Sequence, residues 1–171
     1  MNVEQRLARL EAIEAIKQLK SRYFHACDTK QPELVRQCFA SGEIDLRYGR
    51  IGDFTEREQL VAVFSELACH EHIVEMHHGQ NPRIEVHDDR RASGRWGLYY
   101  HLIDTRQNTV TQLAGFYDDQ YVCVDGQWLI YGSEYRVSST QIFDLSEGLA
   151  KAIFAGAAAP AALDDPANQA L

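Results

Sequence analysis

The sequence predicts a single α+β domain in which helices cover one face of a curved, mostly antiparallel sheet. Up to His70, apolar residues recur every three or four positions, which is the spacing of amphipathic helices. Beyond His70 this spacing gives way to β-rich segments separated by turn signals. A chain of 171 residues with 45% apolar and 25% charged residues has the size and composition of one soluble globular domain. We assign residues 1–142 to that domain.

The first predicted helix is long and amphipathic. It extends from Val3 to about Cys27, and Asn2 with Gln5 has the pattern of a capping box. Its apolar stripe consists of Leu7, Leu10, Ile13, Ile16, Leu19 and Tyr23.

Two shorter helices follow. One begins at Pro32, because proline is favoured in a first turn, and ends near Ser41 and Gly42. The other follows Thr55, with Glu58 completing a second capping box. Both place apolar residues at helical spacing, so each is expected to bury one face.

Three strands are predicted at 92–104, 109–124 and 127–137. The last two flank Asp125-Gly126, a strong hairpin signal. The segment 92–104 alternates, so that Trp96 and Leu98 share one face while Arg95 and Tyr99 share the other. Residues 143–171 are assigned to a further helix over 143–154 and an Ala/Pro-rich tail, for which a lid, an interface segment and a frayed end are the alternatives.

Charge and cysteine usage exclude several classes of protein. The 17 Lys and Arg against 25 Asp and Glu give a net charge of −8, which disfavours partners such as nucleic acid and anionic membranes. The amino-terminal segment has no signal-peptide pattern, and no apolar run is long enough to span a membrane. The four cysteines form no paired motif and predict a reduced, cytoplasmic protein; an extracellular protein with two disulfides is the alternative.

The densest ionisable cluster is CHEHIVEMHHGQN, which begins at Cys69 and holds four of the seven histidines. Its spacing fits no closed metal site, so we predict no metal. His70 and His72 are explained by capping the end of the third helix. His77 is a candidate general base, which needs a carboxylate to fix its tautomer and stabilise the imidazolium.

Asp28 is the candidate carboxylate. It lies where the first helix ends, a position at which a negative charge opposes the helix dipole, so its presence needs another reason. An Asx turn that starts the next helix is the alternative explanation, and spacing alone does not separate the two.

Four segments of the chain resemble the nuclear-transport-factor-2-like superfamily, namely RYFHACDTKQPELVRQCFA, HHGQNPRIEV, AGFYDDQYVCVDGQWLI and EYRV. More narrowly they are similar to its polyketide-cyclase-like branch, which includes scytalone dehydratase, bile-acid 7α-dehydratase and lindane dehydrochlorinase. The resemblance covers roughly residues 11–137. It implies a cone-shaped, cystatin-like α+β barrel, with about three helices packed on the concave face of the sheet around a deep pocket.

The resemblance also implies site residues. Asp28 matches the aspartate that orients the catalytic histidine of this branch, and His77 matches that histidine. Tyr23 matches a tyrosine that binds the substrate oxygen, and Arg136 matches a catalytic arginine of the bile-acid enzyme. Asn81 and four aromatic residues are the further candidates for substrate binding, namely Tyr48, Phe24, Phe64 and Phe116.

These matches predict a lyase or isomerase of the dehydratase type that needs no cofactor and acts on a small hydrophobic cyclic substrate, such as a ketone, a phenol or a steroid. The alternative is a module without catalytic activity that binds small molecules or assembles with partners, including one like the β subunit of a ring-hydroxylating dioxygenase. The open edges of the sheet predict a homo-oligomer, either a trimer or a dimer.

Overall fold

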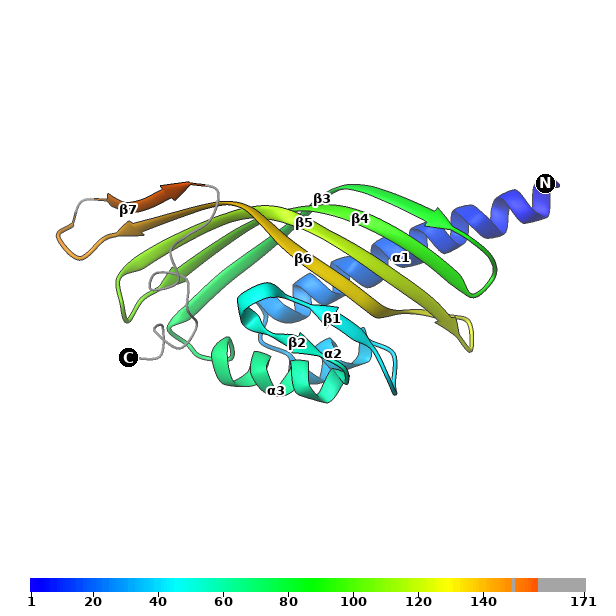
Figure 1. The fold of residues 1–171 in the computed structure, drawn as a ribbon, viewed down its shortest axis with the longest axis horizontal. Coiled ribbons are helices and arrows are strands. Elements are labelled where there is room, and N and C mark those ends of the chain that lie inside the picture. Colours follow the sequence, from blue (N-terminus) through cyan, green and yellow to red (C-terminus); the bar gives the residue numbers. More distant parts are fainter. Residues whose placement is uncertain (149, 157–171) are drawn as a thin grey trace.

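The protein folds as three helices packed against a strongly curved open sheet (Figure 1). This computed structural model describes residues 1–148 and 150–156. Within them the sheet has seven strands in the order β2-β1-β6-β5-β4-β3, with β7 added along β6. All pairings are antiparallel except that of β1 with β6. The predicted α+β class is confirmed.

Helix α1 spans Val3–Asp28 and begins as the sequence predicts. Asn2 Oδ1 accepts a hydrogen bond from the backbone N–H of Gln5 at 2.8 Å, and the Gln5 side chain accepts one from the backbone N–H of Asn2 at 2.9 Å. The buried residues of α1 all lie in its second half, from Ile16 onward. The amino-terminal end projects beyond the sheet (Figure 1), and the partly buried Ala12 packs against the core before the buried residues begin.

The two shorter helices differ from the prediction at their ends. Helix α2 spans Pro32–Gln37 and stops before Ser41 because the backbone there turns to pair Phe39 with Ile130. Helix α3 spans Arg57–Leu67 and is capped by Glu56 with Gln59. The predicted capping box of Thr55 and Glu58 is therefore wrong by one residue.

The strands after α3 form long hairpins. Strand β3 spans Ile73–Val86, β4 spans Arg91–Asp104, β5 spans Thr109–Val124 and β6 spans Gln127–Asp144. Asp125 and Gly126 both have positive φ, as the predicted two-residue turn requires. Short strands β1 (Asp45–Arg47) and β2 (Asp53–Phe54) flank a 3-10 turn, η1 (Gly49–Ile51), at the other edge.

The helix predicted for 143–154 is wrong. Phe143 belongs to β6, and residues Lys151–Gly156 form strand β7, which pairs with Thr140–Asp144. The pairing partner of β7 supplies hydrogen bonds that local sequence does not reveal. The predicted Ala/Pro-rich tail lies beyond Gly156, outside the described residues.

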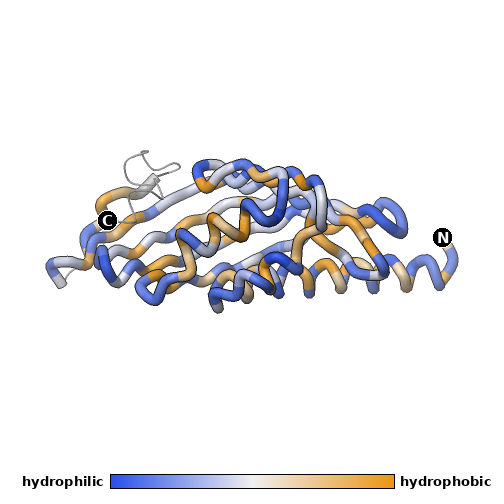
Figure 2. The backbone as a smooth tube through the Cα atoms, turned by 90° about the horizontal axis from the view of Figure 1, so that it is seen from below, coloured by the Kyte–Doolittle hydropathy of each residue, from blue (hydrophilic) through white to orange (hydrophobic). Residues whose placement is uncertain are grey.

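The core lies between the helices and the concave face of the sheet. Seen from below, the hydrophobic positions recur along the helices and strands, whereas the hairpin turns are mostly hydrophilic (Figure 2). One buried ion pair crosses this core, between Lys20 Nζ of α1 and Asp119 Oδ2 of β5 at 2.8 Å. Lys20 Nζ also lies 3.7 Å from the centroid of the Tyr117 ring. The core thus contains a buried ion pair in contact with the aromatic ring of Tyr117.

Among the described residues, no helix has the length and apolar character needed to cross a membrane. All four cysteines are free thiols, so the alternative with two disulfides does not apply to this structure.

Candidate active site

The structure brings Asp28 and His77 together, although they are 49 positions apart in the sequence. Asp28 is the last residue of α1, and His77 lies in β3. Asp28 Oδ1 lies 2.6 Å from His77 Nδ1. Both carboxylate oxygens also accept from the backbone N–H of His77, at 3.1 and 3.2 Å. Because Nδ1 is bound to the carboxylate, Nδ1 is assigned the proton, and Nε2 of the neutral ring is left free to accept one.

Two aromatic rings hold the imidazole from its sides. The Phe24 ring stacks on it at 5.3 Å between centroids and 11° between planes. The Tyr100 ring, from the position paired with His77 in β4, lies 4.7 Å away. Gly79 makes room for this arrangement, because a Cβ atom there would lie 2.5 Å from Phe24 Cε2. The orientation of His77 is therefore fixed by packing as well as by Asp28.

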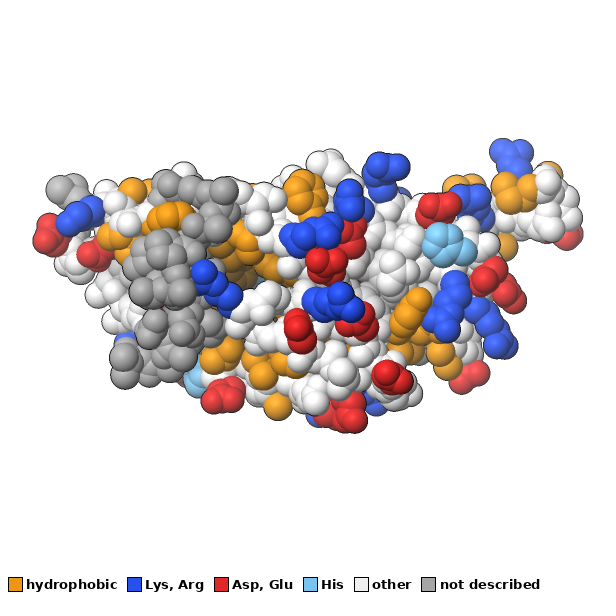
Figure 3. All heavy atoms as spheres, in the orientation of Figure 1, with side chains coloured by type: hydrophobic (Ala, Val, Ile, Leu, Met, Phe, Trp, Pro, Cys, Tyr) orange, Lys and Arg blue, Asp and Glu red, His pale blue; other side chains and the backbone are white. Residues whose placement is uncertain are grey.

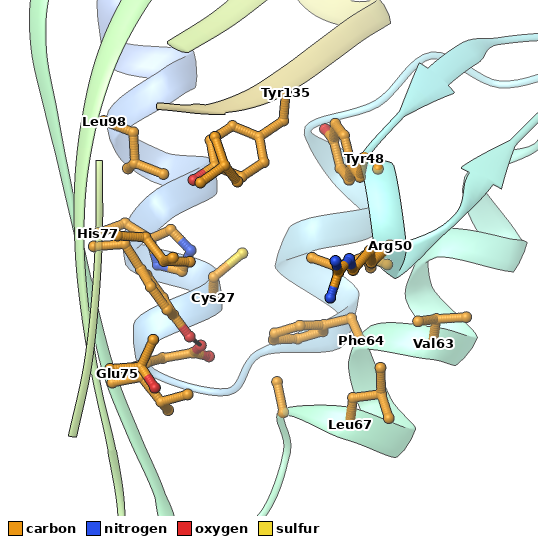
Figure 4. A pocket seen from close by; sticks show the side chains of 18 of the residues that line it. Cys27, Tyr48, Arg50, Val63, Phe64, Leu67, Glu75, His77, Leu98 and Tyr135 are labelled. Atoms are coloured by element: carbon orange, nitrogen blue, oxygen red, sulfur yellow. Dashed lines mark hydrogen bonds between the residues drawn. The ribbon is translucent and has the colours of Figure 1, made fainter. Parts of the chain in front are cut away.

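His77 borders a cavity of about 420 Å³ that is mostly apolar. Its walls come from four parts of the fold: the end of α1, the η1 turn, α3 and the concave face of β3–β6. Figure 4 shows His77 and Glu75 on the sheet side, with Phe64 and Leu67 of α3 facing them across the space. A recess lined by hydrophobic side chains is also visible on the surface in Figure 3. Such a space suits a small hydrophobic ligand.

Tyrosine hydroxyl groups are among the other polar atoms of the cavity lining. Tyr23 and Tyr48 both line it and are buried. Burial raises the pKa of Tyr23 well above its usual value, and burial followed by the nearby charge of Asp119 raises the pKa of Tyr48. These phenols therefore stay protonated at neutral pH and can donate hydrogen bonds to a ligand oxygen.

The structure places some of the predicted site residues at the cavity. Tyr23, Tyr48, Phe64 and His77 line it. Phe24 does not border the cavity but supports the imidazole from behind.

Three predicted residues lie elsewhere. Arg136 and Phe116 are neighbours on β6 and β5 that point to the outer face, because the adjacent residues Tyr135 and Tyr117 point inward. The Arg136 guanidinium pairs with Asp118 and lies 3.2 Å from Glu134 Oε2. Charged side chains of both signs gather over the middle of the face seen in Figure 3. Within the described part of the chain, Arg136 thus does not reach the cavity, and strand parity explains why.

Asn81 is the third of these residues. It has φ of 49° and occupies the point between Gln80 and Arg83 where the pairing of β3 with β4 shifts. Pro82, which cannot donate a backbone hydrogen bond, lies within this irregularity, and the exposed Asn81 stays outside the cavity lining.

Sequence reasoning missed Glu75, Tyr100 and Arg50, which also line the cavity. Strand alternation could have found two of them. Glu75 is two residues before His77 and shares its face, and Tyr100 belongs to the inward set that includes Leu98. Arg50 lies in the short η1 turn, for which the sequence carries no comparable signal.

The histidine cluster does not assemble a metal site. In residues 1–148 and 150–156, no group of three or more His, Cys, Asp or Glu side chains is arranged to hold a metal ion. His70 instead places its Nε2 atom 2.6 Å from the carbonyl oxygen of Glu66, near the end of α3, and its ring stacks on that of His72.

Comparison with known proteins gives a family and a fold. Residues 8–133 match the family model described as SnoaL-like domain. A scytalone dehydratase-like protein from Novosphingobium aromaticivorans superposes with a TM-score of 0.72 at 23% identity, over 78% of this chain and 88% of that one. The hexachlorocyclohexane dehydrochlorinase LinA-type3 from Novosphingobium barchaimii gives 0.69 at 18% identity, over 90% and 98%. A cystatin-like protein from Nostoc punctiforme gives 0.56 at 20% identity, over 71% and 87%.

Proposed function

The chain belongs to the SnoaL-like domain family, and from that premise we propose that it is a cofactor-independent lyase or isomerase of the dehydratase type. Its substrate is a small hydrophobic cyclic molecule, such as a ketone, a phenol or a steroid. The observation that carries the proposal is the Asp28–His77 pair, 2.6 Å apart, at the wall of an apolar cavity. The dehydratase-like and dehydrochlorinase neighbours support the same class of reaction.

The proposed reaction begins at His77 Nε2, the ring nitrogen that is free because Nδ1 is bound to Asp28. His77 Nε2 removes a proton from the carbon next to a carbonyl group, and the electron pair of the C–H bond moves toward the carbonyl oxygen. The Tyr23 hydroxyl, with Tyr48 beside it in the lining, stabilises the charge on that oxygen. In a dehydration, the C–O bond of a β-hydroxyl then breaks, and the hydroxide leaves as water with the proton that His77 had taken. In an isomerisation, the same proton returns to another carbon.

The Asp28 carboxylate lies directly against the imidazolium that forms during this step and stabilises its positive charge. The pair is partly buried, with 14% of the His77 side chain and 18% of the Asp28 side chain exposed. The attraction between the two charges is therefore less screened than on an open surface. A general base held in this way typically accelerates a reaction by about two to four powers of ten.

A module that only binds small molecules or partners is the second candidate. Such a protein has no need for a histidine oriented by a carboxylate, so the Asp28–His77 pair favours the enzyme.

The test uses 3-hydroxy-1-tetralone, which loses water to give the fluorescent product 1-naphthol. The deuterium exchange of 1-tetralone at the carbon next to its carbonyl reports proton abstraction separately. The protein should accelerate at least one of these reactions, and His77→Ala should abolish the acceleration while the circular dichroism spectrum stays unchanged. Equal rates for the protein and His77→Ala would contradict the proposal and favour the binding module.

A further inference from the structure

A second ionisable side chain in the cavity has no part in the chemistry proposed above. Glu75 lies on β3, two residues before His77, and borders the same space. Only 6% of its side chain is exposed. Figure 4 shows its carboxylate at the sheet side of the cavity, below His77.

Glu75 is held by one partner on each oxygen. Its Oε1 forms an ion pair with Lys30 Nζ, from the turn that follows α1. Its Oε2 accepts a hydrogen bond from the Tyr100 hydroxyl at 2.5 Å. Burial, and then the charge of Glu75, raises the pKa of Tyr100 well above its usual value, so this phenol stays protonated and keeps donating. Glu75 is thereby fixed as an acceptor.

The carboxylate still has unused acceptor capacity. An ionised carboxylate offers about four acceptor positions, and the two contacts above use two of them. The cavity wall beside Glu75 is apolar, with Leu98, Leu102 and Ile73 among the lining residues. A carboxylate at such a wall gains free energy when a ligand supplies a further hydrogen-bond donor.

We propose that Glu75 is a substrate-selecting residue that accepts a hydrogen bond from a hydroxyl group of the ligand. The proposal rests on the proposed function for the identity of the reacting end, and adds that the substrate carries an O–H donor at a second position. Adjacent same-face positions of a strand are roughly 6.6 Å apart. In the substrate, the hydroxyl group bound by Glu75 and the carbon that faces His77 are therefore separated by about the width of one six-membered ring.

The competing explanation is purely structural. The ion pair of Glu75 with Lys30 also ties the turn after α1 to β3. If that were the whole role of Glu75, its loss would lower stability without changing which ligands bind. The experiment must therefore compare ligands and not only variants.

The probes are 2-naphthol and 2-methoxynaphthalene, which have the same ring system, but only the naphthol can donate. Binding of both is measured by fluorescence titration at pH 7, with estrone and its 3-methyl ether as a larger pair measured by calorimetry. The protein should bind the hydroxyl form on the order of tenfold more tightly, as expected for a hydrogen bond to a charged group. In Glu75→Gln this preference should fall to less than about threefold.

Two control variants separate the explanations. Glu85→Gln makes the same change on an exposed position of β3 outside the cavity lining and should keep the preference. Lys30→Met breaks the same ion pair but leaves the carboxylate, so it should also keep the preference even if it lowers the melting temperature. Glu75→Gln with an unchanged preference, or a wild-type protein that does not prefer the donor probes, would overturn the proposal.

Turnover is not needed for this measurement. His77→Ala should lose proton abstraction and keep the preference for 2-naphthol. If the protein showed the Glu75-dependent preference but no reaction, the proposed chemistry would fail and the binding role of Glu75 would stand. If the protein catalysed the reaction but showed no Glu75-dependent preference, only the proposed binding role of Glu75 would fail.

Discussion

Replacing Asp28 by Asn tests the charge of the carboxylate with almost no change of shape. Asp28 faces two N–H groups of His77, the ring Nδ1–H at 2.6 Å and the backbone N–H at 3.1 Å. An asparagine has only one acceptor oxygen, so its amide nitrogen must face one of those groups. If it faces the ring, Nδ1 becomes the acceptor, and the proton moves to Nε2, the atom that has to remove a proton from the substrate.

The expected loss can be calculated from this geometry. The charges of the carboxylate and the imidazolium are delocalised, so their centres lie roughly 4 Å apart, at which distance their attraction is about 4 kcal/mol for an effective dielectric constant of about 20. The amide dipole and water recover part of this. A loss of about 2–4 kcal/mol in the transition state corresponds to roughly 30- to 1,000-fold in rate.

The assay is the release of 1-naphthol from 3-hydroxy-1-tetralone, with kcat and KM measured separately. The decrease should appear mainly in kcat, because Asp28 contacts His77 and is absent from the cavity lining. Asp89→Asn, an exposed change in the turn between β3 and β4, is the matched control and should leave kcat unchanged. A kcat for Asp28→Asn within threefold of the wild type would show that the carboxylate does not support the base.

Three further predictions concern packing and burial. Lys20→Met should lower the free energy of unfolding, measured in urea, by about 3–5 kcal/mol, because it leaves Asp119 buried without its cation. Lys17→Met removes an exposed ion pair with Glu14 and should lower the free energy of unfolding by less than about 1 kcal/mol. Gly79→Ala should lower the free energy of unfolding by about 1–3 kcal/mol and should lower kcat, because the added Cβ would displace Phe24 from His77. In Gly97→Ala the added Cβ makes only ordinary van der Waals contacts, so kcat should stay unchanged. Burial raises the pKa of Cys38 from 9.0 to about 11, so the unfolded chain loses this proton first. Stability should therefore fall by about 2 kcal/mol as the pH rises from 9 to 11. Cys38→Ala should show a shallower decline in urea titrations, and an equal decline would refute this cause.

Local patterns predicted those parts of the fold that depend on neighbouring residues. Helix α1 with its capping box and strand β5 (Thr109–Val124) match the sequence prediction because periodicity, caps and turn residues act within a few positions. The predicted helix over 143–154 failed because β7 exists through its pairing with β6, a contact that propensity does not report.

The candidate site, like the fold, contains residues that local patterns can reveal and contacts that only the folded chain creates. The contact between Asp28 and His77 joins two distant parts of the chain. The position of Asp28 at the end of α1 made it a candidate, and the resemblance to a family favoured this contact over an Asx turn. The resemblance also suggested Arg136, but the alternation of β6 turns that side chain to the outer face. Strand alternation alone could have identified Glu75, without the resemblance, because Glu75 shares a face with His77 in β3.

The turn that ends α1 is what makes this arrangement depend on one register. Asp28 and Lys30 lie two residues apart in the chain and pair with His77 and Glu75, which are also two residues apart on β3. A shift of β3 by one residue would turn both partners to the outer face and leave Asp28 and Lys30 without them. The irregularity at Asn81 comes only after this segment, so it changes the pairing of the rest of β3 without disturbing these contacts. The end of α1 therefore contacts the base and the acceptor of the cavity together, and a change that shifts the register of β3 against α1 should impair both proton abstraction and the choice of ligand.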